Sequence, residues 1–168
     1  MNSWWLWIGF HGYTILTVLS LVVLIYKNNS FFILVFLCFY FINKYINKSL
    51  KWLIEDPRPM REAGVGGVVI ANTSFDDVRY YQGSEKFGMP SGHLQIMFYN
   101  ISFLYFLYCG TELLLFSFFL ACITFYQRWL FKRHSVEQLL MGAFVGSCVG
   151  AIAVESGRFL WRTLPRGR

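Results

Sequence analysis

Basic side chains and imidazoles gather in three short polar segments of this 168-residue chain. The segments cover residues 51–59, 88–93 and 128–138. Each segment adjoins an apolar stretch long enough to form a helix, so these side chains would stand at helix ends. If the ends meet, the segments bring together two imidazoles, several cations and a helix N-terminus.

Such a set of groups is suited to binding phosphate. Arginine makes bidentate contacts to phosphate oxygens, lysine supplies a point charge, and backbone N–H groups at a helix start add further donors. The sequence Pro-Ser-Gly supplies such a start, with Ser91 as an N-cap or hydroxyl donor and Gly92 allowing close backbone approach. The predicted phosphate ligands are Lys51, Arg58, Ser91, Gly92 and Arg128.

The two histidines of these segments, His93 and His134, indicate chemistry beyond binding. One imidazole can attack phosphorus and form a phosphohistidine, while another protonates the departing oxygen and then activates water. On a helix, His134 and Gln138 are four residues apart and share a face. The Gln138 amide oxygen can therefore accept from Nδ1–H of His134, which leaves Nε2 free to attack.

Taken one at a time, these features also have structural explanations. The cations Lys51, Arg58 and Arg128 could extend to lipid headgroups, and Pro-Arg-Pro could simply end a helix. Either histidine alone would more often be a hydrogen-bonded structural residue. Their order along the chain and their shared side of the protein favour a common site.

The order of the motifs resembles the type 2 phosphatidic acid phosphatase (PAP2) superfamily of membrane lipid phosphatases. The signature of that superfamily is Lys-x6-Arg-Pro, then Pro-Ser-Gly-His, then Ser-Arg-x5-His-x3-Asp. Here the first two motifs are intact, and the resemblance covers about residues 45–150. The third motif is present as Arg128-x5-His134, with Gln127 in place of Ser and Gln138 in place of Asp.

The residue at position 138 narrows the resemblance to one branch. The dolichyl diphosphate phosphatases are similar at this point, with Arg-x5-His-x3-Gln. That branch also resembles this chain around residues 51–59 and 87–91, and at His93 and Gln95. Glu137 lies about 100° from Gln138 on a helix, so it is a weak substitute for the missing Asp.

Carried over to this chain, the resemblance implies a role for each motif residue. It implies that His134 is the nucleophile, that His93 is the general acid and base, and that Gln138 orients His134. It also implies that the five predicted phosphate ligands hold the phosphoryl oxygens. Neither a metal nor another cofactor is expected.

The composition indicates an integral membrane protein. Hydrophobic residues make up 56% of the chain and charged residues 14%, against about 45–50% and 25% in soluble domains. We expect an all-α, polytopic membrane helix bundle. Its apolar stretches predict about five transmembrane helices, at residues 4–26, 31–46 with an amphipathic extension to 54, 94–108, 113–126 and 138–154.

Small residues in these stretches predict how the helices pack. Gly142, Gly146 and Gly150 recur every four residues, which predicts close approach of another helix in the bundle interior. The four cysteines lie in or beside apolar stretches without CxxC spacing, and we expect small buried hydrophobes rather than disulfides or zinc ligands. These cysteines are Cys38, Cys109, Cys122 and Cys148.

We expect one domain over residues 1–168, with a motif-bearing core at about 45–150 and a basic tail at 155–168. Residues 58–89 predict a polar extramembrane loop on the same side as the connection at 127–137. The arginines of the tail place it in the cytoplasm by the positive-inside rule. The site would then face the lumen or the exterior.

The resemblance implies a metal-independent enzyme that hydrolyses dolichyl (polyprenyl) diphosphate to the monophosphate and recycles this carrier lipid for N-glycosylation. The expected location is the endoplasmic reticulum membrane. The expected partners are the lipid and the bilayer, and the net charge of +6 does not imply nucleic acid. The alternatives are a phosphatase for phosphatidic acid or undecaprenyl diphosphate, and a non-catalytic phospholipid-binding relative.

Overall fold

A computed structural model describes residues 4–59, 68–69, 79–80 and 86–164. Most of the predicted loop at 58–89 therefore lies outside the described residues. The described chain is helical apart from two short strands, as expected from the sequence. Its elements are α1 (Trp4–Tyr26), α2 (Ser30–Ile54), β1 (Val68–Val69), β2 (Arg79–Tyr80), α4 (Gly92–Tyr108), α5 (Thr111–Leu130) and α6 (Val136–Thr163), and the two strands pair antiparallel.

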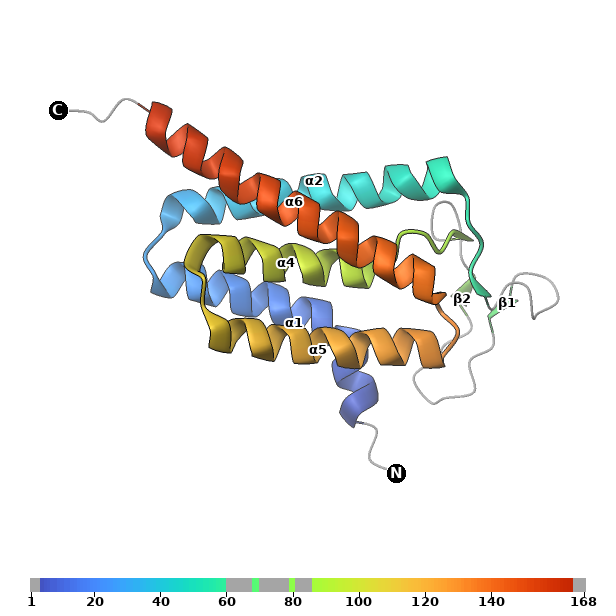
Figure 1. Ribbon diagram of the computed structural model, residues 1–168. Coiled ribbons are helices and arrows are strands. Elements are labelled where there is room, and N and C mark those ends of the chain that lie inside the picture. Colours follow the sequence, from blue (N-terminus) through green and yellow to red (C-terminus); the bar gives the residue numbers. More distant parts are fainter. Residues whose placement is uncertain (1–3, 60–67, 70–78, 81–85, 165–168) are drawn as a thin grey trace.

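The five helices run alternately in opposite directions and form one bundle (Figure 1). The turns that join α1 to α2 and α4 to α5 lie at one end. At the other end, α2 finishes, α4 begins and α5 connects to α6. All three polar segments therefore meet at this second end, which we call the site end.

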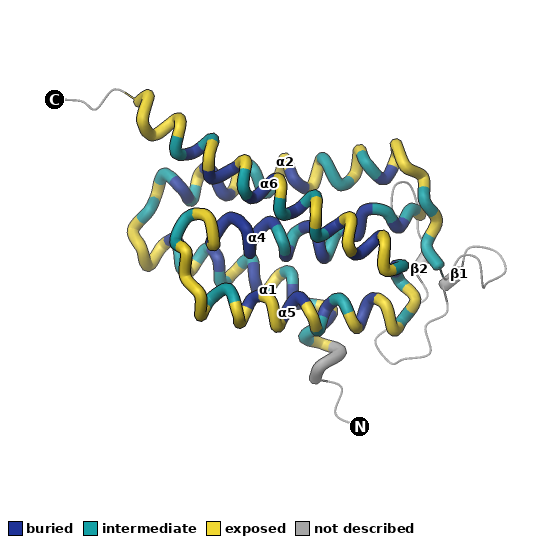
Figure 2. The backbone as a smooth tube through the Cα atoms, in the orientation of Figure 1, coloured by how far each residue is buried: buried dark blue, intermediate teal, exposed yellow. Residues whose placement is uncertain are grey.

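Four helices, α1, α2, α5 and α6, are long and apolar enough to cross a membrane, which indicates a multi-pass membrane protein. Their outer faces are exposed (Figure 2) and carry large apolar side chains such as Phe119 and Phe144. The remaining helix, α4, has 17 residues and contacts the other four. Because its neighbours surround it, α4 can carry buried polar residues such as Gln95 and Asn100.

Two expectations differ from the structure. Helix α6 extends past residue 154 to Thr163, and an exposed ion pair of 2.6 Å joins Glu155 to Arg158 along this extension. The cysteines were wrongly expected to be buried. All four are free and exposed, because apolar residues of membrane helices face lipid as well as the interior.

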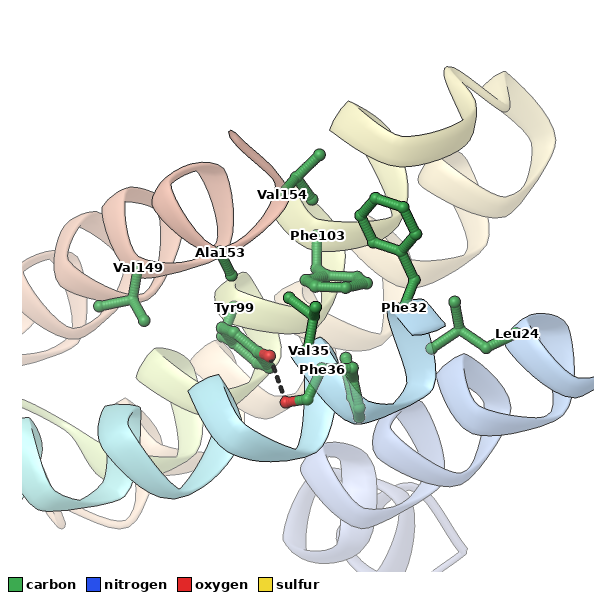
Figure 3. Packing of buried hydrophobic residues seen from close by; sticks show 9 residues of the cluster. All are labelled: Leu24, Phe32, Val35, Phe36, Tyr99, Phe103, Val149, Ala153 and Val154. Carbon is green, nitrogen blue, oxygen red and sulfur yellow. Dashed lines mark hydrogen bonds between the residues drawn. The ribbon is translucent and has the colours of Figure 1, made fainter. Parts of the chain in front are cut away.

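An aromatic cluster fixes α2 against α4 and α6 (Figure 3). Phe36, Tyr99 and Phe103 are fully buried within it. The Tyr99 hydroxyl donates to the Phe36 carbonyl oxygen at 2.6 Å. This bond satisfies a polar group that burial would otherwise leave without a partner.

The glycine stripe of α6 lies directly on α4, as the four-residue spacing predicted. A Cβ at Gly142 would stand 2.5 Å from the Ser91 carbonyl oxygen, and one at Gly146 would overlap the Gln95 carbonyl. The backbones of α4 and α6 therefore touch at the site end. This contact holds the second and third polar segments together.

We predict that Gly146→Ser lowers the thermal unfolding midpoint of the detergent-solubilised protein by several degrees. The new Cβ meets backbone that cannot move aside, which costs about 1–3 kcal/mol or more. Gly110→Ser is the matched control, because a Cβ there meets nothing within 4 Å and serine is favoured at this N-cap position. Equal midpoints for the two variants would contradict the close contact.

Candidate active site

The connection between α5 and α6 places His134 in the interior. The chain turns through Lys132, which has a left-handed φ of 49°, and α6 then begins with a capping box. In this box the Ser135 hydroxyl accepts from the Gln138 N–H at 3.3 Å, and the Ser135 N–H donates to Gln138 Oε1 at 3.2 Å. His134 directly precedes the cap and is only 3% exposed.

The Gln138 carboxamide has a defined orientation. Its Nε2 donates to Asp56 Oδ2 at 2.6 Å and to the Pro57 carbonyl at 2.8 Å. Because both partners are acceptors, Oε1 must face the opposite way, where His134 Nδ1 lies 3.3 Å away. The contact expected between His134 and Gln138 is therefore present in the structure.

The tautomer of His134 follows from its second contact. Arg58 Nη1 lies 3.2 Å from His134 Nε2, and a guanidinium can only donate. His134 Nε2 must then hold the lone pair, and Nδ1 carries the proton that is donated to Gln138. The nitrogen with the lone pair thus faces the cations. Arg58 is itself positioned by donating to the Arg133 carbonyl at 3.1 Å.

The surroundings of His134 keep its imidazole neutral. Burial lowers the pKa of His134 well below its usual value of 6.5, and the nearby charges of Arg58 and Lys51 lower it further. His93 and Arg128 act in the same direction. At neutral pH Nε2 consequently keeps its lone pair, which accepts from Arg58 in this structure.

His93 lies in the first turn of α4 and is enclosed partly by α1. The Arg128 guanidinium donates to His93 Nε2. The Tyr13 ring meets the His93 ring edge-on at 4.6 Å between centroids, and the Phe10 ring lies 5.1 Å from Arg128 Cζ. Helix α1, which carries no family motif, therefore forms one wall of the site.

The second polar segment presents donors to the same region. Ser91 occupies the N-cap position of α4, but its side chain makes no capping bond. Its buried hydroxyl has no hydrogen-bond partner among the residues that the structure describes. The Ser91 N–H donates to the Gln138 carbonyl at 2.9 Å, which fixes this segment against α6.

The structure brings all the predicted site residues to the site end of the bundle. Direct contacts join Arg58 to His134, His134 to Gln138, and Arg128 to His93. Lys51, in the last turn of α2, is buried and acts electrostatically on His134.

Sequence reasoning missed the role of Asp56. Its carboxylate contacts Gln138, whereas Glu137 is exposed. The position of Asp56 within the first motif and the Ser-x-x-Gln pattern of the capping box were available signals. Sequence reasoning also missed Gly88. A Cβ at this position would overlap the Gln138 carboxamide.

This arrangement can bind a tetrahedral oxyanion and transfer its phosphorus to nitrogen. The cations Arg58, Lys51 and Arg128 lie close to a neutral imidazole whose lone pair faces Arg58. A sequence profile described as the PAP2 superfamily matches residues 31–162, which include all three polar segments. The chain belongs to the PAP2 superfamily.

PAP2 members are phosphatases, and membership indicates a phosphatase that acts on lipid phosphates. Comparison with curated proteins gave no match, and comparison with solved structures gave none either. The narrower similarity to one PAP2 branch therefore rests on the motif residues themselves.

We predict that Asp56→Asn lowers kcat for lipid phosphate hydrolysis about tenfold and leaves KM nearly unchanged. The variant removes a charge-assisted bond that orients Gln138 and, through it, His134. Glu55→Gln is the matched control, because Glu55 is the adjacent, exposed carboxylate. Equal activity in the two variants would show that Asp56 does not support His134.

Proposed function

We propose that this protein hydrolyses the terminal phosphate of a polyprenyl diphosphate, dolichyl diphosphate, to give the monophosphate and inorganic phosphate. The observation that carries the proposal is the hydrogen-bonded chain from Asp56 through Gln138 to His134. It gives a neutral imidazole a defined tautomer with its lone pair toward a cluster of cations. Membership of a lipid phosphatase superfamily supports the same chemistry.

The terminal phosphate would bind among Lys51, Arg58, Arg128, the Ser91 hydroxyl and the Gly92 N–H. In the structure the two arginines donate to the two imidazoles. Phosphate oxygens are stronger, charged acceptors for guanidinium groups. Substrate binding would therefore draw both arginines onto phosphate and release Nε2 of each histidine for reaction.

Hydrolysis would take two steps. His134 Nε2 attacks the terminal phosphorus, and the anhydride P–O bond breaks with its electron pair on the departing oxygen. His93 takes up a proton at Nε2 once phosphate has drawn Arg128 away from it, and donates this proton to the departing oxygen. Water then attacks the phosphohistidine while His93 accepts a proton from it. The P–N bond breaks, its electron pair returns to His134, and inorganic phosphate leaves.

Gln138 favours a diphosphatase branch over a phosphatidic acid phosphatase. The motif Arg-x5-His-x3-Gln resembles dolichyl diphosphate phosphatases, whereas the general superfamily signature has Asp at this position. The contact of Gln138 with Asp56 offers a physical reason why Gln is functional here. The carboxylate still acts on His134, but through one intervening amide.

Phosphate release by the purified protein in detergent with EDTA tests this proposal. Dolichyl diphosphate, dolichyl monophosphate and phosphatidic acid are compared, with His134→Ala as the inactive control. We expect selective cleavage of the diphosphate and a loss of at least about a thousandfold in the variant. Preference for phosphatidic acid would overturn the dolichyl assignment, and no release from any lipid would overturn the phosphatase proposal.

We also propose that the protein is a single domain in the endoplasmic reticulum membrane and recycles the carrier lipid for N-glycosylation. The site end would face the lumen, and the basic C-terminal tail would face the cytoplasm. Four glycosylation sequons begin at Asn28, Asn47, Asn72 and Asn100, and those at Asn47 and Asn100 lie within helices α2 and α4. Asn28 lies in the turn between α1 and α2, at the end opposite the site, and Asn72 lies outside the described residues.

We predict that expression in eukaryotic cells gives glycosylation at Asn72 and not at Asn28. Asn72→Gln should then abolish the glycan-dependent mobility shift, and Asn28→Gln should leave it unchanged. Glycosylation at Asn28 instead would reverse the proposed orientation.

A further inference from the structure

A cavity of about 290 Å³ lies beside the proposed catalytic centre. Residues of α1, α2 and α4 line it, and His93 forms part of its wall. Of the two histidines of the site, His93 is the one found among the described residues of this lining. The cavity therefore opens on the side of the centre where the proposed general acid stands.

Three side-chain amides lie along this cavity, those of Asn47, Gln95 and Asn43. The Pro90 carbonyl group fixes the orientation of the first, and each amide in this series then fixes the orientation of the next. The Asn47 Nδ2 donates to the Pro90 carbonyl at 3.1 Å and to Gln95 Oε1 at 2.7 Å. Gln95 Nε2 must then face Asn43, where it donates to the backbone oxygen at 2.9 Å and to Oδ1 at 2.8 Å.

The series ends in an available donor. Asn43 is fully buried, and its Nδ2 has no hydrogen-bond partner among the described residues. A buried N–H group without an acceptor is costly. Asn43 lines the cavity, so an acceptor bound there would satisfy it.

A cation stands next to this donor. Lys44 also lines the cavity, and its ammonium lies 5.7 Å from the centroid of the Tyr40 ring. The side chain is exposed, so its charge is available to a ligand in the cavity. A positive charge and an available N–H donor together select an anion.

The direction of the proposed reaction identifies this anion. His134 attacks phosphorus from one side, and the leaving oxygen departs on the opposite side, toward His93. The cavity adjoins His93 and would therefore hold the leaving group. For a lipid diphosphate the leaving group is the lipid-borne phosphate, whereas for phosphatidic acid it is a neutral alcohol.

We propose that the cavity between α1, α2 and α4 is a binding site for the lipid-borne phosphate of a diphosphate substrate, with Lys44 and Asn43 as its ligands. This inference rests on the proposed function. The two residues precede Lys51 by about two turns of α2, or about 10 Å, which places them nearer the bilayer centre. A substrate whose tail remains in lipid would thus extend from the catalytic centre through this cavity.

Binding of two non-hydrolysable ligands with the same tail tests the proposal. Farnesyl methylenediphosphonate carries both phosphorus groups. Farnesyl phosphonate carries one, which we expect to bind among the three cations Lys51, Arg58 and Arg128 of the proposed catalytic centre rather than beside the single cation Lys44. Their affinities are measured by calorimetry on detergent-solubilised wild type, Lys44→Ala and Lys48→Ala. Lys48 is the matched control, because it is an exposed lysine one turn further along α2 and is not among the described residues of the cavity wall.

We expect Lys44→Ala to weaken binding of the diphosphonate about tenfold and of the monophosphonate less than about twofold. Lys48→Ala should change neither affinity. Asn43→Asp keeps the acceptor for Gln95 but replaces the donor with a negative oxygen, so it should weaken the diphosphonate selectively as well. Equal effects of Lys44→Ala on the two ligands, or no effect on either, would overturn the proposal.

The same variants separate this inference from the proposed function. In one outcome, wild type releases no phosphate from any lipid while Lys44→Ala still weakens binding of the diphosphonate more than of the monophosphonate. In that case the lipid-borne phosphate site exists and the proposed hydrolysis is wrong. If His134-dependent hydrolysis occurs but Lys44→Ala does not discriminate between the ligands, the hydrolysis stands and the lipid-borne phosphate site is wrong.

Discussion

Gln138 is the residue on which the site depends, because its carboxamide and its backbone carbonyl together join all three polar segments. It donates to Asp56 and Pro57 of the first segment and accepts from His134 of the third. The second segment attaches at the same residue, through the Ser91 N–H and the Gln138 carbonyl. An amide can do this because it donates and accepts at once, whereas a carboxylate at position 138 could only accept.

The second constraint is electrostatic. Lys51 and Arg128 are buried at the site end, close enough to His134 to lower its pKa. Holding positive groups together away from water is unfavourable unless anions balance them. A phosphate bound as we propose would supply that balance, so the arrangement that depresses the pKa of His134 would also attract the proposed substrate.

The sequence predicted the parts of this site that depend on local spacing. The four-residue interval between His134 and Gln138 and the glycine interval in α6 are helical repeats, so their consequences follow from the chain itself. The Asp56 contact and the series from Asn47 through Gln95 to Asn43 depend on how α2 meets α4 and α6. No local pattern encodes that register. The cysteines were misjudged for a related reason, since apolarity in a membrane helix does not distinguish the interior from the lipid face.

The central claim is that His134 attacks phosphorus, and trapping the covalent intermediate tests it most directly. The protein is mixed with a prenyl diphosphate radiolabelled in its terminal phosphate, quenched rapidly under alkaline conditions and mapped by peptide mass spectrometry. The account predicts an acid-labile, base-stable label on His134 that appears before phosphate is released. A label on His93, or phosphate release without any labelled histidine, would contradict it.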